Sequence, residues 1–124
     1  MKTAATAVQM LIRLVGLILI VLGVLFWTGH DLELIPVHIY IGLFFVLLLW
    51  TQSLMAARAK VGLGLVGVEI VWGIAVLVLG MMQGQLLPGN AHWVIQVLHL
   101  LLGAGAIGFA EALGARMKRA TRPE

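Results

Sequence analysis

The stretch VQMLIRLVGLILIVLGVLFW, residues 8–27, has the length and composition of a helix that spans a lipid bilayer. It is apolar over the roughly 20 residues that a helix needs to cross the hydrocarbon core of a bilayer, and Arg13 is its one charged residue. Residues 36–57, 61–82 and 91–115 form three more runs of this kind. The sequence therefore predicts four membrane-spanning helices.

The composition of the whole chain agrees with this interpretation. Of its 124 residues, 62% are hydrophobic and 10% are charged, whereas soluble domains carry about 25% charged residues. The connections TGHDLELIP, RAK and QGQLLPGN are short, which places consecutive helices antiparallel. We expect residues 1–124 to form a single all-α domain, an integral membrane up-down-up-down four-helix bundle. The first run is expected to be retained, because FWTGHD lacks the small-residue pattern of a signal-peptide cleavage site.

The basic residues indicate how the bundle is oriented. Apart from Arg13, the Lys and Arg residues lie at Lys2, in the connection at 58–60 and in the tail at 116–122. These segments fall on one side of a four-span protein, and Lys/Arg-rich segments stay on the cytoplasmic side. The distribution predicts a multi-pass protein of the bacterial inner membrane with both termini cytoplasmic. The positive charge is thus interpreted as a topology signal and not as a nucleic-acid-binding surface.

Two histidines interrupt the apolar runs in the same way. His38 and His99 are each followed four residues later by a glycine, Gly42 and Gly103, on nearly the same helical face. By helical rise, His38 lies about 28 Å and His99 about 25 Å from the cytoplasmic end of its helix, so one outer layer should hold both. The two faces continue as stripes: Phe45, Leu49 and Gln52 in the second run, and Ala106, Ala110 and Gly114 in the fourth.

Haem binding is the function that this pair favours. Neutral imidazoles are good axial ligands of haem iron, and helix bundles build cofactor sites from side chains on facing helices. In this hypothesis His38 and His99 hold a b-type haem for electron transfer or haem sensing. Gly42 and Gly103 would then make room for the flat porphyrin.

Other uses of the histidines stay open. In a structural or accessory protein they would only hydrogen-bond neighbouring helices. His30 and His92 could also join His38 and His99 in a zinc site, or hold a second haem. The sequence has no nucleophile elbow, paired-carboxylate motif or cysteine, and its GLGLVG follows a basic loop inside an apolar run, so enzymatic activity is not predicted.

Arg13, Glu69 and Glu111 form a second predicted layer, an intramembrane charge layer about 8–12 Å from the cytoplasmic ends. Arg13 and Glu111 are near enough to an end to extend toward water, whereas Glu69 is deeper and suggests a small transporter as a further alternative. Because four helices leave little interior for Glu69 in one protomer, we expect a homodimer in the lipid bilayer. Two glutamines lie near this level, and three glycines share the Glu69 face and should pack closely on another helix: Gln9, Gln52, Gly62, Gly73 and Gly80.

The two halves of the chain are similar. LGVLFW in the first run and LGMMQG in the third each lead across a loop to a helix with a histidine–glycine pair. Gly23 precedes His38 by 15 residues, and Gly80 precedes His99 by 19, one helical turn more. This pattern predicts two duplicated helical hairpins related by a pseudo-two-fold axis along the membrane normal.

Two stretches also resemble known membrane proteins. HWVIQVLHLLLGAGAIGFAEALGARMKR, residues 92–119, is similar to the last helix of small, mostly uncharacterised bacterial four-helix integral membrane proteins, and PVHIYIGLFFVLLLW, residues 36–50, resembles their second helix. The bundle is also similar to membrane b-type cytochromes, which hold haem between histidines on different helices. That resemblance implies axial positions for His38 and His99. Diheme members use four helical histidines, so only one haem is implied here.

Overall fold

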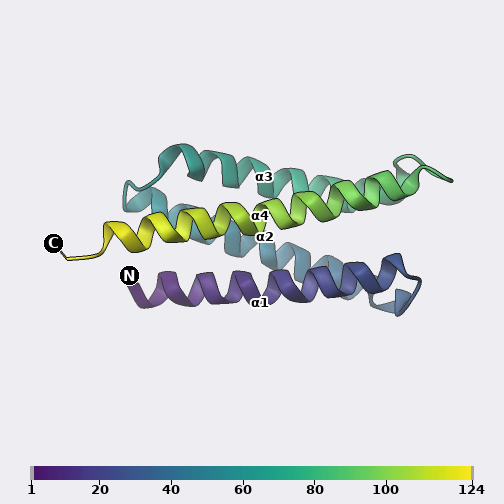
Figure 1. Cartoon of the computed structure of the whole chain (residues 1–124), viewed down its shortest axis with the longest axis horizontal. Helices are drawn as coiled ribbons and strands as arrows, with labels where there is room; N and C mark the ends of the chain where they lie inside the picture. Colours follow the sequence, from purple (N-terminus) through teal and green to yellow (C-terminus); the bar gives the residue numbers. More distant parts are fainter. Residues whose placement is uncertain (1, 124) are drawn as a thin grey trace.

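The computed structural model describes residues 2–123 and contains four long helices that lie side by side (Figure 1). They are α1 (Lys2–Trp27), α2 (Ile35–Arg58), α3 (Leu63–Met82) and α4 (His92–Ala120), with short 3-10 turns at Leu32–Leu34 and Gln83–Gln85. Each long helix is apolar enough to cross a membrane, which confirms the all-α four-helix membrane bundle.

The two ends of the bundle differ in charge. Both termini lie at the same end as the connection between α2 and α3 (Figure 1). We call this the basic end, because it carries Lys2, Lys60 and the tail from Arg116. The opposite end, with the connections that contain His30 and residues 83–91, is called the histidine end. The one-sided placement of basic residues that the sequence indicated is thus present in the fold.

Two helices, α1 and α4, extend well beyond the apolar runs at the basic end. α1 begins at Lys2, six residues before the predicted start, and α4 continues to Ala120, five residues past the predicted end. Hydropathy marks only the part of a helix that lies in lipid. The additional residues are mainly Ala, Lys, Arg and Met, which favour helix in water as well.

Two of the helices end in the same hydrogen-bonded turn. After α1, the His30 amide donates to the Leu25 carbonyl and the Gly29 amide to Phe26, while Gly29 has a φ of 80°. This is the Schellman arrangement, in which a left-handed residue satisfies the last carbonyls of the helix. After α2 the left-handed position is held by Lys60, with a φ of 56°.

The helices form a ring in chain order. Each packs on the next, α4 closes the ring against α1, and α2 also contacts α4 across the middle. Within residues 2–123, α1 and α3 have no such contact. Of the two diagonal pairs, α2 and α4 are therefore the closer one, and they separate α1 from α3.

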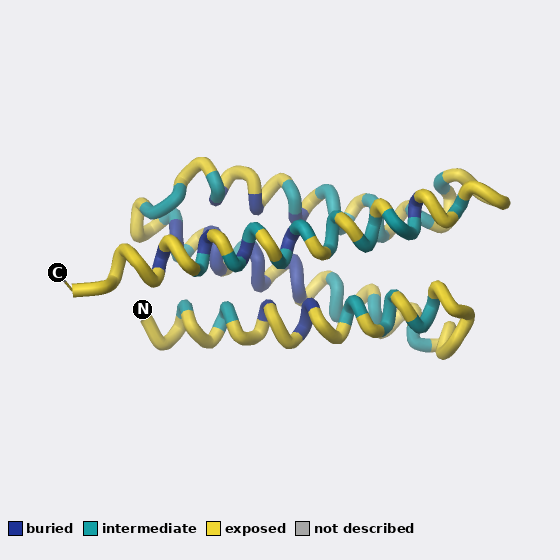
Figure 2. Tube along the Cα trace, in the orientation of Figure 1, coloured by how far each residue is buried: buried dark blue, intermediate teal, exposed yellow. Residues whose placement is uncertain are grey.

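Buried residues gather in the middle of the bundle and toward the basic end (Figure 2). A central core and a basic-end core are distinct clusters. At the histidine end most positions are only half-buried or exposed, so the packing there is more open. The central core contains Ile12, Val15, Phe45, Leu48, Leu49, Ala106 and Ala110, and the basic-end core contains Ala56, Val66, Leu113 and Met117.

Glycines let tryptophan rings approach neighbouring helices closely. A Cβ on Gly105 would lie 2.9 Å from the Trp72 ring, and the Trp72 indole donates a 2.8 Å hydrogen bond to the Leu102 carbonyl. Trp50 covers Gly73 in the same way, with its indole nitrogen 3.1 Å from the Cβ position. Close approach at small residues is the usual way in which membrane helices associate.

Candidate functional site

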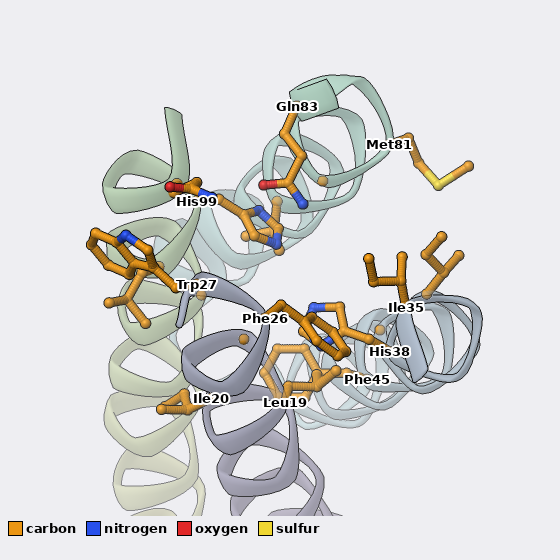
Figure 3. A pocket seen from close by; sticks show the side chains of 18 of the residues that line it. Leu19, Ile20, Phe26, Trp27, Ile35, His38, Phe45, Met81, Gln83 and His99 are labelled. Carbon is orange, nitrogen blue, oxygen red and sulfur yellow. The ribbon is translucent and has the colours of Figure 1, made fainter. Parts of the chain in front are cut away.

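A cavity of about 480 Å³ opens at the histidine end between all four helices. This size lies within the range of about 300–1,000 Å³ that is typical of ligand pockets. His38 and His99 line the cavity from α2 and α4, and Figure 3 shows their rings directed into the same space. The rest of the wall is mainly apolar and includes Leu19, Ile20, Ile39, Phe45, Val76, Leu77, Leu100 and Ile107.

The two imidazole rings lie 6.4 Å apart between centroids, with 62° between their planes. Phe26 packs edge-on against His38 at 5.4 Å. The prediction from helical rise that both histidines share one layer is therefore confirmed. Nδ1 of each ring is buried and has no hydrogen-bond partner within residues 2–123.

Two pairs of glycines surround the rings and serve different purposes. Cβ atoms on Gly42 and Gly103 would meet nothing within 4 Å, and both residues line the cavity. Their missing side chains therefore leave open space and do not bring helices together. Gly80 is different, because a Cβ there would lie 2.8 Å from Cε1 of His99; at Gly23 the Cβ would be 3.9 Å from Cε1 of His38.

The separation of the histidines matches a metal held between them. With a metal–nitrogen distance of about 2.0–2.1 Å and a ring radius of roughly 1.1 Å, two opposed imidazoles have centroids roughly 6 Å apart. The donor set, the apolar wall and the two open glycines all fit haem.

One feature of known metal sites is missing. A ligating histidine usually donates its second ring N–H to a carbonyl or carboxylate, which fixes the ring. Here neither Nδ1 has such a partner in the described chain. Packing against Gly80 and Phe26 orients the rings in place of hydrogen bonds.

Polar side chains stand at the mouth of the cavity. Gln83, His92 and Gln96 line it there, and the His92 ring lies 3.1 Å from the Leu86 carbonyl oxygen. His30 instead contacts the Thr28 hydroxyl at 3.0 Å. No group of three or more potential metal ligands gathers anywhere between residues 2 and 123, so the structure does not assemble the four-histidine zinc site.

The predicted charge layer divides into two parts. Arg13 on α1 and Glu111 on α4 form a bidentate ion pair, with Nε–Oε1 at 2.6 Å and Nη2–Oε2 at 2.8 Å. Glu69 does not take part in this pair. It is fully buried and accepts a 2.6 Å hydrogen bond from the hydroxyl of Ser53 on α2.

A chain of amides extends from the ion pair into the bundle. Gln9 donates to Glu111 Oε1 at 2.7 Å and accepts from the Gln52 amide, which also donates to the Ala110 carbonyl at 3.1 Å. Because a carboxylate and a carbonyl only accept, the two ends of the chain fix the direction of every donor in it. Gln52 Oε1 is left buried and without a partner among residues 2–123.

The burial of Glu69 corrects one premise of the sequence analysis. A single chain buries this carboxyl completely, so the argument that a second protomer is needed to cover it is wrong. Self-association stays a prediction, and Glu69 no longer supports it.

A second cleft opens at the basic end. Its volume is about 760 Å³, and its lining includes Gln9, Gln52, Arg13 and Glu111. Lys2, Lys118 and Arg122 are among the residues around it. The amide chain is therefore open to the basic end, while the histidine pair is open to the other end.

No protein-family profile, curated protein or solved structure matches the chain. The resemblance to membrane b-type cytochromes consequently stays a prediction from the residues quoted above.

The sequence predicted that Gly80 packs closely on another helix but did not identify His99 as its partner, and it assigned no role to Gly23 or Ser53. In both hairpins a glycine precedes a histidine, and this repeat was the sequence signal for the two contacts. Gly23 meets His38, and Gly80 meets His99. Ser53 had no signal of its own. A lone serine in an apolar helix commonly bonds to its own backbone, and only the fold shows that it faces Glu69.

Proposed function

We propose that this chain is a haem-binding protein of the bacterial inner membrane, with a b-type haem held between His38 and His99. The observation that carries the proposal is the 6.4 Å separation of two histidine rings inside one apolar cavity. A bis-histidine haem supplies a one-electron couple whose potential depends on its surroundings. Electron transfer or haem sensing is the role proposed for the protein.

The chain's own residues would bind and orient the group. His38 and His99 supply the two ligands from the short diagonal of the bundle. Gly42 and Gly103 leave the space that a porphyrin needs, and the apolar wall excludes water. Gln83 and Gln96 provide hydrogen-bonding groups at the mouth, where the polar edge of a porphyrin would meet the aqueous phase.

The one-sided basic residues support an orientation for this site. Lys/Arg-rich segments are retained in the cytoplasm, so both termini and the basic end are proposed to be cytoplasmic. The histidine end would then face the periplasm. A haem there would lie nearer to the outer surface of the inner membrane.

The proposal is tested by expressing the protein with ample haem supply and recording its spectrum. The wild type should purify with haem and show the sharp bands of low-spin, six-coordinate iron after reduction. His38→Ala and His99→Ala should each remove one ligand and give high-spin iron or no haem, while His30→Ala and His92→Ala should leave the bands unchanged. If haem still binds in both His38→Ala and His99→Ala, the ligands are His30 or His92 instead.

Two glycine variants separate a haem slot from histidines that only pack. Gly103→Leu would fill the cavity and should abolish haem binding. Gly108→Leu lies on the same helix, has equally open space around it and does not line the cavity, so it should keep haem. If wild-type protein contains no iron, the bridging-histidine function takes the place of the haem proposal.

A further inference from the structure

A second site lies in the other half of the bundle and does not depend on haem. Glu69 is the only ionisable residue of α3, and none of its side chain is exposed. Oε2 accepts the Ser53 hydrogen bond, while Oε1 is buried without a partner in the described residues. A carboxyl group in this setting has one strong contact and no charge to balance it.

No cation on the neighbouring helices reaches Glu69. Arg13 of α1 is paired with Glu111 of α4, and this is the only ion pair found in residues 2–123. On α4, the Arg116 side chain lies against Gly62, seven residues before Glu69 and about 10 Å nearer to the basic end. On α2, Arg58 lies five residues beyond Ser53, about 7 Å nearer to that end.

An unpaired carboxylate at this position would be very costly. Burial of an isolated charge away from water is so unfavourable that the group is neutralised instead. Ser53 donates one hydrogen bond to Oε2, which suits the carbonyl oxygen of a neutral acid. Oε1 is then the oxygen that carries the proton.

Aromatic and apolar side chains lie beside Glu69 toward both ends of the bundle. Toward the histidine end, Trp50 covers α3 at Gly73 and its indole donates to the Ile70 carbonyl at 3.4 Å. Toward the basic end, Ala56 and Val66 belong to the basic-end core. Along α2 the nearest polar side chain is that of Gln52, the residue before Ser53; it lines the basic-end cleft, and its buried Oε1 has no donor among residues 2–123.

We infer that Glu69 and Ser53 form a proton-binding site within the membrane, and that the basic-end cleft ending at Gln52 is the route by which its proton exchanges. Gln52 lines that cleft and its buried Oε1 has no donor among residues 2–123, so a water molecule that entered from the cleft would donate to it and relay a proton toward Ser53. No redox chemistry is involved, because the proton only binds and leaves.

Infrared spectroscopy of the protein in lipid nanodiscs at neutral pH tests the charge state. The wild type should show the carbonyl band of a protonated carboxylic acid, and labelling with ¹³C-glutamate should shift that band. Glu69→Gln should abolish it, whereas Glu33→Gln and Glu111→Gln should keep it. Ser53→Ala should move the band to higher frequency, because the carbonyl loses its hydrogen bond.

Three results would overturn the inference. The first is a wild-type spectrum without a glutamate acid band, which remains informative even if Glu69→Gln does not fold. The second is a band that survives Glu69→Gln. The third is a band seen in potassium but abolished by sodium, since the carboxyl would then bind Na⁺ in preference to a proton.

The route is tested by transfer into D₂O, which shifts the band as the proton is replaced by deuterium. Gln52→Leu should slow this exchange, because it removes the amide oxygen of the residue that lines the basic-end cleft. Gln96→Leu is the matched control at the mouth of the histidine-end cavity and should leave the rate unchanged. Slower exchange in Gln96→Leu alone would place the route at the opposite end and overturn this part of the inference.

Discussion

Cε1 of the His99 ring lies so close to Gly80 that a Cβ at that position would be 2.8 Å from it. The corresponding pair in the first hairpin is looser, because a Cβ on Gly23 would lie 3.9 Å from Cε1 of His38. The two hairpins thus repeat one packing motif at different tightness. In both, the backbone of one helix limits where the histidine of the next can lie.

Gly80→Ala should therefore displace the His99 ring, whereas Gly23→Ala should be tolerated. Overpacking of this kind typically costs about 1–3 kcal/mol, while a contact at 3.9 Å is ordinary. Thermal denaturation in mild detergent should show a clear loss of stability only for Gly80→Ala. In haem-loaded protein the low-spin bands should change for that variant alone. Equal behaviour of the two variants would contradict the asymmetry of the hairpins.

The Arg13–Glu111 pair should couple the first and last helices energetically. Arg13→Gln leaves Glu111 with Gln9 as its only side-chain partner, and Glu111→Gln leaves Arg13 without a counter-charge. We expect the double variant to be less destabilised than the sum of the singles, as is usual for groups in one network. Melting curves of the four proteins measure this coupling, and strictly additive effects would show that the pair contributes nothing.

Gly114→Ala should disturb the amide chain. A Cβ there would collide with the side-chain oxygen of Gln9 and lie 3.2 Å from the Gln52 amide nitrogen. Gln9 cannot simply move away, because it is hydrogen-bonded on both sides. A loss of about 1–3 kcal/mol is expected from this overpacking. Gly108→Ala on the same helix has open space and is the control, with stability expected to be unchanged or slightly higher.

Single cysteines test the proposed orientation directly, because the natural chain has none. A cysteine at Thr28 or Asn90 should react with a membrane-impermeant thiol reagent added to whole cells. A cysteine at Thr121 should react only after the cells are opened. The reverse pattern would invert the topology and place the histidine end in the cytoplasm.

Periodicity and helical rise were sufficient to predict much of this architecture. A rise of about 1.5 Å per residue, counted from the basic ends, placed His38 and His99 in one layer before any packing was known. The same count of helical rise placed Arg13 and Glu111 at one level. These predictions succeeded because they concern position along a helix axis, which sequence number determines.

Rotation about those axes was predicted only in part: the stripes from Phe45 to Gln52 and from Ala106 to Ala110 are buried as the helical faces indicated, but the pairing of the helices was not predicted. Whether the short diagonal joins α2 and α4 or α1 and α3 depends on many side-chain contacts at once. The sequence placed Gly103 on the face of His99 and predicted open space there, but it did not predict that Gly105, two residues on, faces Trp72. For the same reason the contact of Ser53 with Glu69 emerged only from the fold.

The ring of helices divides into two halves at the connection between α2 and α3, where Lys60 and Gly62 are both left-handed. Each half is a hairpin that contributes one histidine, so neither half holds a complete pair. If the chain were cut there and the hairpins made as separate polypeptides, their reunion in the membrane would create the His38–His99 pair anew. Ligand binding would then report assembly itself, and the protein would serve as a two-part sensor of whether its halves have met.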